Sequence, residues 1–159
     1  MTAFVPPRTA QSVCTAADLD NYRTACLSPS AIPIACQQFV ANHAACAACL
    51  APAPTSSGPL LAHAGEVQVN VGGCIALVLG DRASSSCGAR QQTAIDCVEH
   101  ACAACNASCA AAAREGPCLD AQLHTCAELG PAATCALAKG FADDYRRVAT
   151  LFCGARKLD

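Results

Sequence analysis

The sequence predicts a mainly α-helical fold of about five helices, cross-linked by disulfides and carrying one small β-hairpin insert near residues 66–79. Fifteen of the 159 residues are cysteine, a frequency close to that of disulfide scaffolds. Val, Ile, Leu and Phe supply only 30 residues, whereas 37 are alanine, and burying an alanine removes little apolar surface from water. A chain with so thin an apolar core needs covalent or metal cross-links.

The first half is expected to contain two helices followed by a loop. Thr15 and Asp18 have the spacing of a capping box, which predicts a helix over Ala16–Leu27. A second helix is expected over residues 33–50, because the proline at its start suits a first helical turn. Residues 51–59, APAPTSSGP, have the composition of a loop.

A β-hairpin is expected next. Residues 66–71 alternate polar and apolar side chains, the period of a half-buried strand. Gly72 and Gly73 would form a two-residue turn, and residues 74–79 would return as the second strand. The alternative is a single strand followed by a short buried helix that starts at Cys74.

The second half is predicted to be helical. Glycine and proline mark the boundaries, because glycine favours helix ends and proline favours helix starts. The expected helices cover Ala89–Arg114, 117–130 and 131–152, the last with Gly140 as a point where it could break and Gly154 as a C-terminal cap. We therefore expect an N-terminal linker (1–13) and one disulfide-stapled domain (14–159) with a loop and β insert at 51–87.

Charge and hydropathy argue against nucleic-acid binding and against a transmembrane segment. The net charge is −2 and no basic stripe is present, which argues against nucleic acid. No apolar run is long enough for a transmembrane segment. Asp143, Asp144, Arg146 and Arg147 form the one local charge cluster, which we interpret as a solvated helix face with pairs such as Asp143 and Arg147.

All fifteen cysteines are candidate disulfide residues. Nine stand alone, often near the ends of predicted elements, where pairwise cross-links are typical. An odd number leaves one thiol over, which could join two chains in a dimer, and the sequence specifies no pairing. The residues are Cys14, Cys26, Cys36, Cys46, Cys49, Cys74, Cys87, Cys97, Cys102, Cys105, Cys109, Cys118, Cys126, Cys135 and Cys153.

A metal-thiolate site is the main alternative. Residues 97–109, CVEHACAACNASC, place Cys102, Cys105 and Cys109 within a helical arc of roughly 60° among alanines. This stripe resembles those of copper-storage four-helix bundles, which implies Cu(I) as cargo. The two CxxC pairs, Cys46 with Cys49 and Cys102 with Cys105, could instead form a four-cysteine zinc site. The ligands in this alternative would be Cys46, Cys49, Cys102, Cys105, Cys109 and His43.

The wider cysteine framework, over residues 14–154, is similar to cysteine-rich exported proteins of myxobacteria. The motifs that carry the similarity are Cys26, Cys36-Gln-Gln-Phe39, Cys46-Ala-Ala-Cys49, Asn70-Val-Gly-Gly-Cys-Ile-Ala76, Cys87-Gly88, Ala101-Cys-Ala-Ala-Cys105 and Phe152-Cys-Gly154. The resemblance implies export and adds no reaction. The first residues, MTAFVPPRTAQSV, are unlike a signal peptide, so we expect a mature chain whose export signal has been removed and replaced by a start methionine.

These observations predict an exported, disulfide-rich helical module that binds a ligand or has a structural role. We expect it to be secreted, periplasmic or at the cell surface, where disulfides persist. Its partner would be a protein, a glycan or a small molecule, and no cofactor is expected. Motifs of zinc hydrolases, serine hydrolases and nucleotide-binding enzymes are missing, which favours a role without catalysis. The alternatives are Cu(I) or Zn(II) storage and a small secreted enzyme whose site has no recognised motif.

Overall fold

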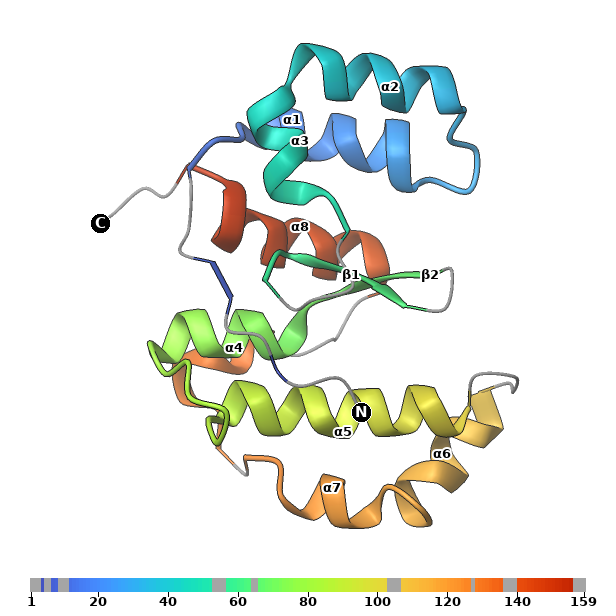
Figure 1. The fold of residues 1–159 in the computed structure, drawn as a ribbon, viewed down its shortest axis with the longest axis vertical. Helices are drawn as coiled ribbons and strands as arrows, with labels where there is room; N and C mark the ends of the chain where they lie inside the picture. Colours follow the sequence, from blue (N-terminus) through green and yellow to red (C-terminus); the bar gives the residue numbers. More distant parts are fainter. Residues whose placement is uncertain are drawn as a thin grey trace.

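The computed structural model describes residues 4, 7–8, 12–52, 57–63, 66–102, 107–126, 128–135 and 140–155. Most of the expected linker at 1–13 lies outside these residues, so the division into linker and domain stays a prediction. The described part is mainly helical with one two-stranded antiparallel sheet, which confirms the predicted fold class. Figure 1 shows α8 and the sheet in the middle, with α1, α2 and α3 on one side and α4, α5, α6 and α7 on the other.

The N-terminal helices begin where the sequence predicts. Helix α1 (Ala16–Tyr22) continues through a π-helical turn (Arg23–Leu27) and starts at a capping box. The hydroxyl of Thr15 accepts a hydrogen bond from the Asp18 main-chain N–H at 3.1 Å, and the Asp18 carboxylate accepts one from the Thr15 main-chain N–H at 2.8 Å. These bonds satisfy main-chain donors that the first turn of a helix leaves unpaired.

The expected helix at 33–50 is two helices, α2 (Pro33–Asn42) and α3 (Ala44–Leu50). The break falls at His43, whose φ of −129° and ψ of 46° are outside the helical region. The break changes the direction of the chain (Figure 1), and it lets α3 pack against α8 rather than extend α2.

The hairpin is present, but its position differs from the expectation. Strand β1 (Leu60–His63) pairs with β2 (Glu66–Val69), so the partner strand precedes β2. Residues 74–79, expected as the second strand, belong to helix α4 (Val71–Leu79). The cause is Asn70, whose side-chain oxygen accepts a hydrogen bond from the Gly73 N–H at 2.7 Å and so starts a helix at this point.

Helices α4 and α5 (Cys87–Ala101) pack closely because two glycines face each other. A Cβ atom added at Gly88 would lie 2.3 Å from the main-chain oxygen of Gly72, so this approach requires glycine. Helix α5 starts at Ser86, whose hydroxyl accepts a hydrogen bond from the Ala89 N–H at 3.2 Å.

The expected long helix over 89–114 is also two helices. Helix α5 ends at Ala101, because Cys102 has a φ of −115° and a ψ of 15°, and α6 (Ala107–Glu115) is a separate helix that packs against α5. Residues 103–106 between them lie outside the described part. The break lets the chain turn back towards α5 (Figure 1).

The last third contains shorter helices than the sequence predicts. The segment expected as helix 117–130 holds only α7 (Leu119–Leu123), and a 3-10 helix (Gly130–Cys135) follows. Helix α8 (Phe141–Cys153) starts at Gly140, the expected break, where φ is 95° and glycine is favoured.

The main core forms around α8. The side chains of Tyr145, Val148 and Phe152 are almost completely buried on one face of this helix. They pack with large residues of the surrounding elements, namely Leu19 of α1, Leu50 of α3, Leu60 of β1 and Ile75 of α4. Cysteines and alanines fill much of the remaining core, so the contribution of apolar burial is small for a chain of this length.

The segment just before α1 meets the end of α8 beside this core. The main-chain N–H groups of Val13 and Cys14 both donate to the Cys153 oxygen at 2.8 Å, and the Ala155 N–H donates to the Cys14 oxygen at 3.1 Å. No helix in the described part is long and apolar enough to span a membrane.

Candidate functional site

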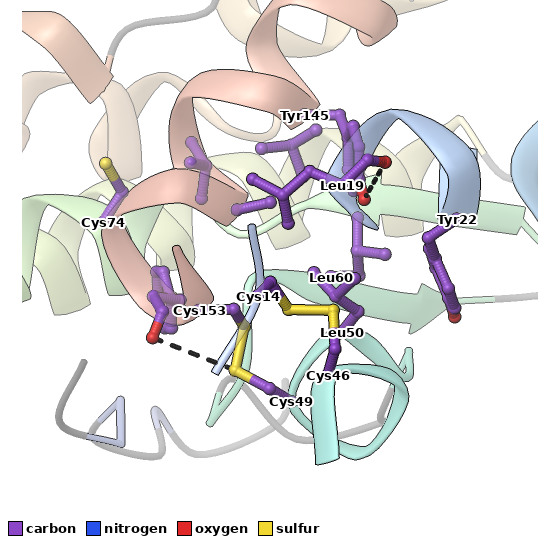
Figure 2. Close-up of a cluster of buried hydrophobic side chains, with 14 of the residues drawn as sticks. Cys14, Leu19, Tyr22, Cys46, Cys49, Leu50, Leu60, Cys74, Tyr145 and Cys153 are labelled. Carbon is purple, nitrogen blue, oxygen red and sulfur yellow. Dashed lines mark hydrogen bonds between the residues drawn. A yellow bond between two sulfur atoms is a disulfide. The ribbon is translucent and has the colours of Figure 1, made fainter. Parts of the chain in front are cut away.

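The CxxC motif of α3 is linked to the segment just before α1 and to the end of α8. Cys46 forms a disulfide with Cys14, and Cys49 forms one with Cys153, so the two thiols of the motif have different partners (Figure 2). All four cysteines are buried. Because the N-terminal segment and the end of α8 already pair through their main chains, the two bridges fix the same junction covalently.

Four further disulfides join the other elements. One links the segment after α1 to α2, one links α4 to the 3-10 helix, and two link α5 to the segments on either side of α7. The pairs are Cys26–Cys36, Cys74–Cys135, Cys87–Cys126 and Cys97–Cys118. Every one of the six bridges therefore joins two different elements or segments, as expected where side chains within one helix point apart.

The remaining three cysteines are Cys102, Cys105 and Cys109. Cys102 is a reduced thiol, and the Cys109 sulfur lies 3.9 Å from the Ala101 main-chain oxygen. Cys105 lies outside the described residues. The expectation of one leftover cysteine, and of a dimer through it, therefore stays a prediction.

The alternative metal ligands are not brought together. The disulfides of Cys46 and Cys49 remove both thiolates from the candidate set. The ring of His43 stacks on Phe39 with centroids 4.7 Å apart, and its Nδ1 lies 3.1 Å from the Asp18 carboxylate. Within the residues that the structure places, no three histidine, cysteine or acidic side chains form a metal-binding group.

The charge cluster on α8 is partly buried, unlike the solvated face that we expected. Arg147 pairs with Asp144 rather than with Asp143, and the Asp144 side chain is only 4% exposed. Arg146 makes an ion pair with Asp20 of α1, whose pKa is lowered by the hydrogen bonds from the guanidinium. The first pair lies within α8 and the second joins α8 to α1, so the cluster has a structural role.

A candidate binding site in the described part of the chain is a cleft of about 500 Å³ between α4, α5, α6 and α7. We call it the α5 cleft. Apolar side chains form most of its lining, and polar groups lie among them at the α5, α6 and α7 walls. Its residues are Val71, Ile75, Gln91, Ala94, Ile95, Val98, Glu99, Ala110, Arg114, Gln122 and Leu129.

A second cavity of about 480 Å³ lies on the neighbouring side of α5, next to β2 and the start of α8. It shares Ile95 and Glu99 with the α5 cleft, so the two hollows adjoin at these residues. Its other polar lining groups are Gln68 and Asp144, and Asp144 is already paired with Arg147. The α5 cleft is therefore the better candidate for a ligand.

Two disulfides hold the walls of the α5 cleft. Cys97–Cys118 ties α5 to the start of α7, and Cys87–Cys126 ties the start of α5 to the segment after α7. Gln122 and Leu129, which lie on either side of Cys126 in the sequence, line the cleft. The cross-links thus place side chains from separate short elements around one hollow.

Sequence reasoning missed this cleft. Its residues come from five segments, and each helical stripe alone looks like part of an ordinary core. The spacing of Ala94, Ile95 and Val98 on α5 predicts one apolar helix face, and this spacing does not distinguish the wall of a cleft from an ordinary core face.

Comparisons of the chain with protein-family models, curated proteins and solved structures give no match. The class of protein is thus defined by its own structure: a disulfide-rich, mainly helical protein with a largely apolar cleft.

Proposed function

We propose that this chain is an exported binding module that holds an apolar small molecule in the α5 cleft. The observation that carries the proposal is that disulfides connect the walls of this cleft, namely Cys97–Cys118 and Cys87–Cys126. A site held by covalent cross-links is formed before a ligand arrives, so little free energy is lost in ordering it.

The six disulfides support an oxidising compartment as the place of action. Such bridges persist in secreted, periplasmic and cell-surface proteins, whereas the cytosol keeps most thiols reduced. Location outside the cytoplasm is therefore part of the proposal.

The lining of the cleft supports an apolar ligand with one acidic group. Its volume falls within the range of small-molecule pockets, roughly 300–1,000 Å³. Ile95 and Val98 provide apolar contact surface. Of the two charged lining residues, Glu99 already has an interaction partner, whereas Arg114 makes no hydrogen bond or ion pair within the described part. The guanidinium of Arg114 is thus available to a carboxylate or sulfonate.

Metal storage is a weaker proposal, because it needs reduced cysteines that converge. Two of its six expected ligands, Cys46 and Cys49, form disulfides with Cys14 and Cys153. A secreted enzyme whose site has no recognised motif stays an open alternative, and no specific contact favours it.

The test uses anilinonaphthalene sulfonate, a fluorescent apolar anion. Ala110 lines the cleft on α6, so Ala110→Phe fills the hollow and should weaken probe binding by about tenfold or more. Ala112→Phe is the matched control, because Ala112 is an exposed residue of the same helix. If the unaltered chain fails to bind the probe, or if both variants bind it equally, the proposal is wrong.

The acidic group is tested separately. Arg114→Gln should weaken binding of the sulfonate probe several-fold and leave binding of the uncharged probe phenylnaphthylamine unchanged. An equal loss for both probes would show that Arg114 contributes only contact area.

A further inference from the structure

In two of the six described disulfides, both cysteines are partly exposed. Cys87 and Cys126 are half-buried, as are Cys26 and Cys36, whereas each of the other four bridges has at least one buried cysteine. Thiol–disulfide exchange requires a thiolate to approach one sulfur along the S–S axis. In the first two bridges neither cysteine is buried, so these bridges are the first candidates for reaction.

A cation distinguishes one of these two bridges. Arg90 lies one turn after Cys87 on α5, and its Nη2 is 3.3 Å from the Cys126 sulfur and 3.9 Å from the Cys87 sulfur. In the described part of the chain, the Arg90 side chain makes no ion pair, and its hydrogen bonds go to these two sulfurs. No charged side chain in the described part makes a hydrogen bond to the Cys26–Cys36 bridge.

A guanidinium at a disulfide favours cleavage of that disulfide. When the S–S bond breaks, its electron pair goes to the departing sulfur as a thiolate, and an adjacent arginine stabilises that charge. A better-stabilised leaving group departs faster. The position of Arg90 against Cys126 therefore matches the requirement of a reactive bridge.

We propose that Cys87–Cys126 is a site of thiol–disulfide exchange with a dithiol reductant and that its opening loosens the α5 cleft. One thiolate of the dithiol attacks the Cys87 sulfur, forming a mixed disulfide and releasing Cys126 as a thiolate beside Arg90. The second thiolate of the reductant then attacks the mixed disulfide. Two electrons pass to the protein, both cysteines become thiols by taking two protons, and the dithiol leaves as a disulfide.

The effect on the cleft follows from the neighbouring bridges and rests on the proposed function. Cys97–Cys118 and Cys74–Cys135 hold the two ends of the segment that contains Cys126. Opening Cys87–Cys126 releases the middle of this segment, where Gln122 and Leu129 line the cleft. The opened form should hold an apolar ligand less tightly.

The exchange is tested on the folded chain by brief treatment with dithiothreitol, alkylation of new thiols and peptide mapping. Cys87 and Cys126 should be alkylated first and Cys26 and Cys36 later. Arg90→Gln should slow opening of Cys87–Cys126 by about threefold or more and leave Cys26–Cys36 unchanged. Arg82→Gln, which removes an exposed positive charge from the preceding loop, is the matched control and should have no such effect.

Three results would overturn the exchange site: Cys26–Cys36 opens first, Arg90→Gln behaves like Arg82→Gln, or Arg90→Gln accelerates opening because the side chain merely shields the sulfurs. The coupling to the cleft has its own readout, the affinity for anilinonaphthalene sulfonate before and after selective opening. An unchanged affinity contradicts the coupling. A chain that never binds the probe contradicts the proposed function. In that case, peptide mapping of the alkylated cysteines still shows whether Cys87–Cys126 is the exchange site.

Discussion

The hydroxyl of Tyr145 donates a hydrogen bond to the main-chain oxygen of Leu19 at 3.0 Å, across 126 positions of the chain. Figure 2 shows this bond above the two disulfides of the CxxC motif. It joins α8 to α1 within the main core, where both side chains are at most 2% exposed. Helices α1 and α8 are therefore joined by a buried polar contact, and the two disulfides of the CxxC motif connect Cys14, just before α1, and Cys153 of α8 to α3.

Tyr145→Phe should lower the free energy of unfolding by about 1 kcal/mol or somewhat more, because it leaves the Leu19 oxygen unpaired in the core. Tyr22→Phe is the matched control. Tyr22 is also buried, but its hydroxyl makes no hydrogen bond in the described part, so its removal should have a smaller effect. Urea unfolding of the two variants measures the difference, and equal losses would contradict a specific role for the Tyr145 hydroxyl.

Alkaline pH should unfold the chain through its two tyrosines. Burial raises the pKa of Tyr145 and of Tyr22 above the ordinary value of 10.0. Because the pKa of each tyrosine is higher in the folded state than in the unfolded state, its contribution to the free energy of unfolding is fully present below pH 10.0. This contribution is lost as the pH rises above that value. Phenolate absorbance should therefore appear together with the loss of helical circular dichroism. If phenolate formed near pH 10.0 while the helical circular dichroism stayed unchanged, this prediction would be wrong.

Gly88→Ala should lower the free energy of unfolding by about 1–3 kcal/mol, because the new methyl group would collide with the main chain of α4 at Gly72. Gly58→Ala is the control, since a Cβ at Gly58 would meet its nearest atom at an ordinary 3.5 Å. Thermal unfolding of both variants gives the comparison. A Gly88→Ala variant as stable as Gly58→Ala would mean that α4 and α5 pack less closely.

Removing the Cys49–Cys153 bridge should destabilise the chain more than removing Cys26–Cys36. The first closes a sequence separation of 104 and the second one of 10, and the loss of unfolded-state entropy grows with loop length. We expect about 2–4 kcal/mol for Cys49→Ala with Cys153→Ala, and less for Cys26→Ala with Cys36→Ala. Urea unfolding of the paired variants tests the order, and the reverse order would contradict it.

Local signals in the sequence were enough to predict the fold class and several helix starts. Thr15 and Asp18 act within four residues, and Gly140 determines its own backbone, so both features can be read without knowledge of the neighbours. The disulfide chemistry was likewise expected from the dispersed cysteines and the thin core. Pairing was beyond the sequence, because partners such as Cys49 and Cys153 meet only in the folded chain.

The second half of the predicted hairpin shows why other elements were missed. The run Cys74–Leu79 is apolar and equally suited to a buried strand or a buried helix. Asn70 decides between them, because its side chain bonds both to the Gly73 N–H and, at 2.6 Å, to the Gly58 oxygen from the preceding loop. The second contact is tertiary. The α5 cleft depends in the same way on five segments that meet only in the folded chain.

We infer that cross-links between elements stabilise this chain, whose apolar core is small. Peptide mapping without reduction, on protein folded under oxidising conditions, shows whether these cross-links form. We predict linked peptides for the six described bridges, including Cys14–Cys46 and Cys49–Cys153, and an intact mass at least about 12 Da below that of the reduced chain. A folded chain with nearly all of its fifteen thiols free would contradict the account.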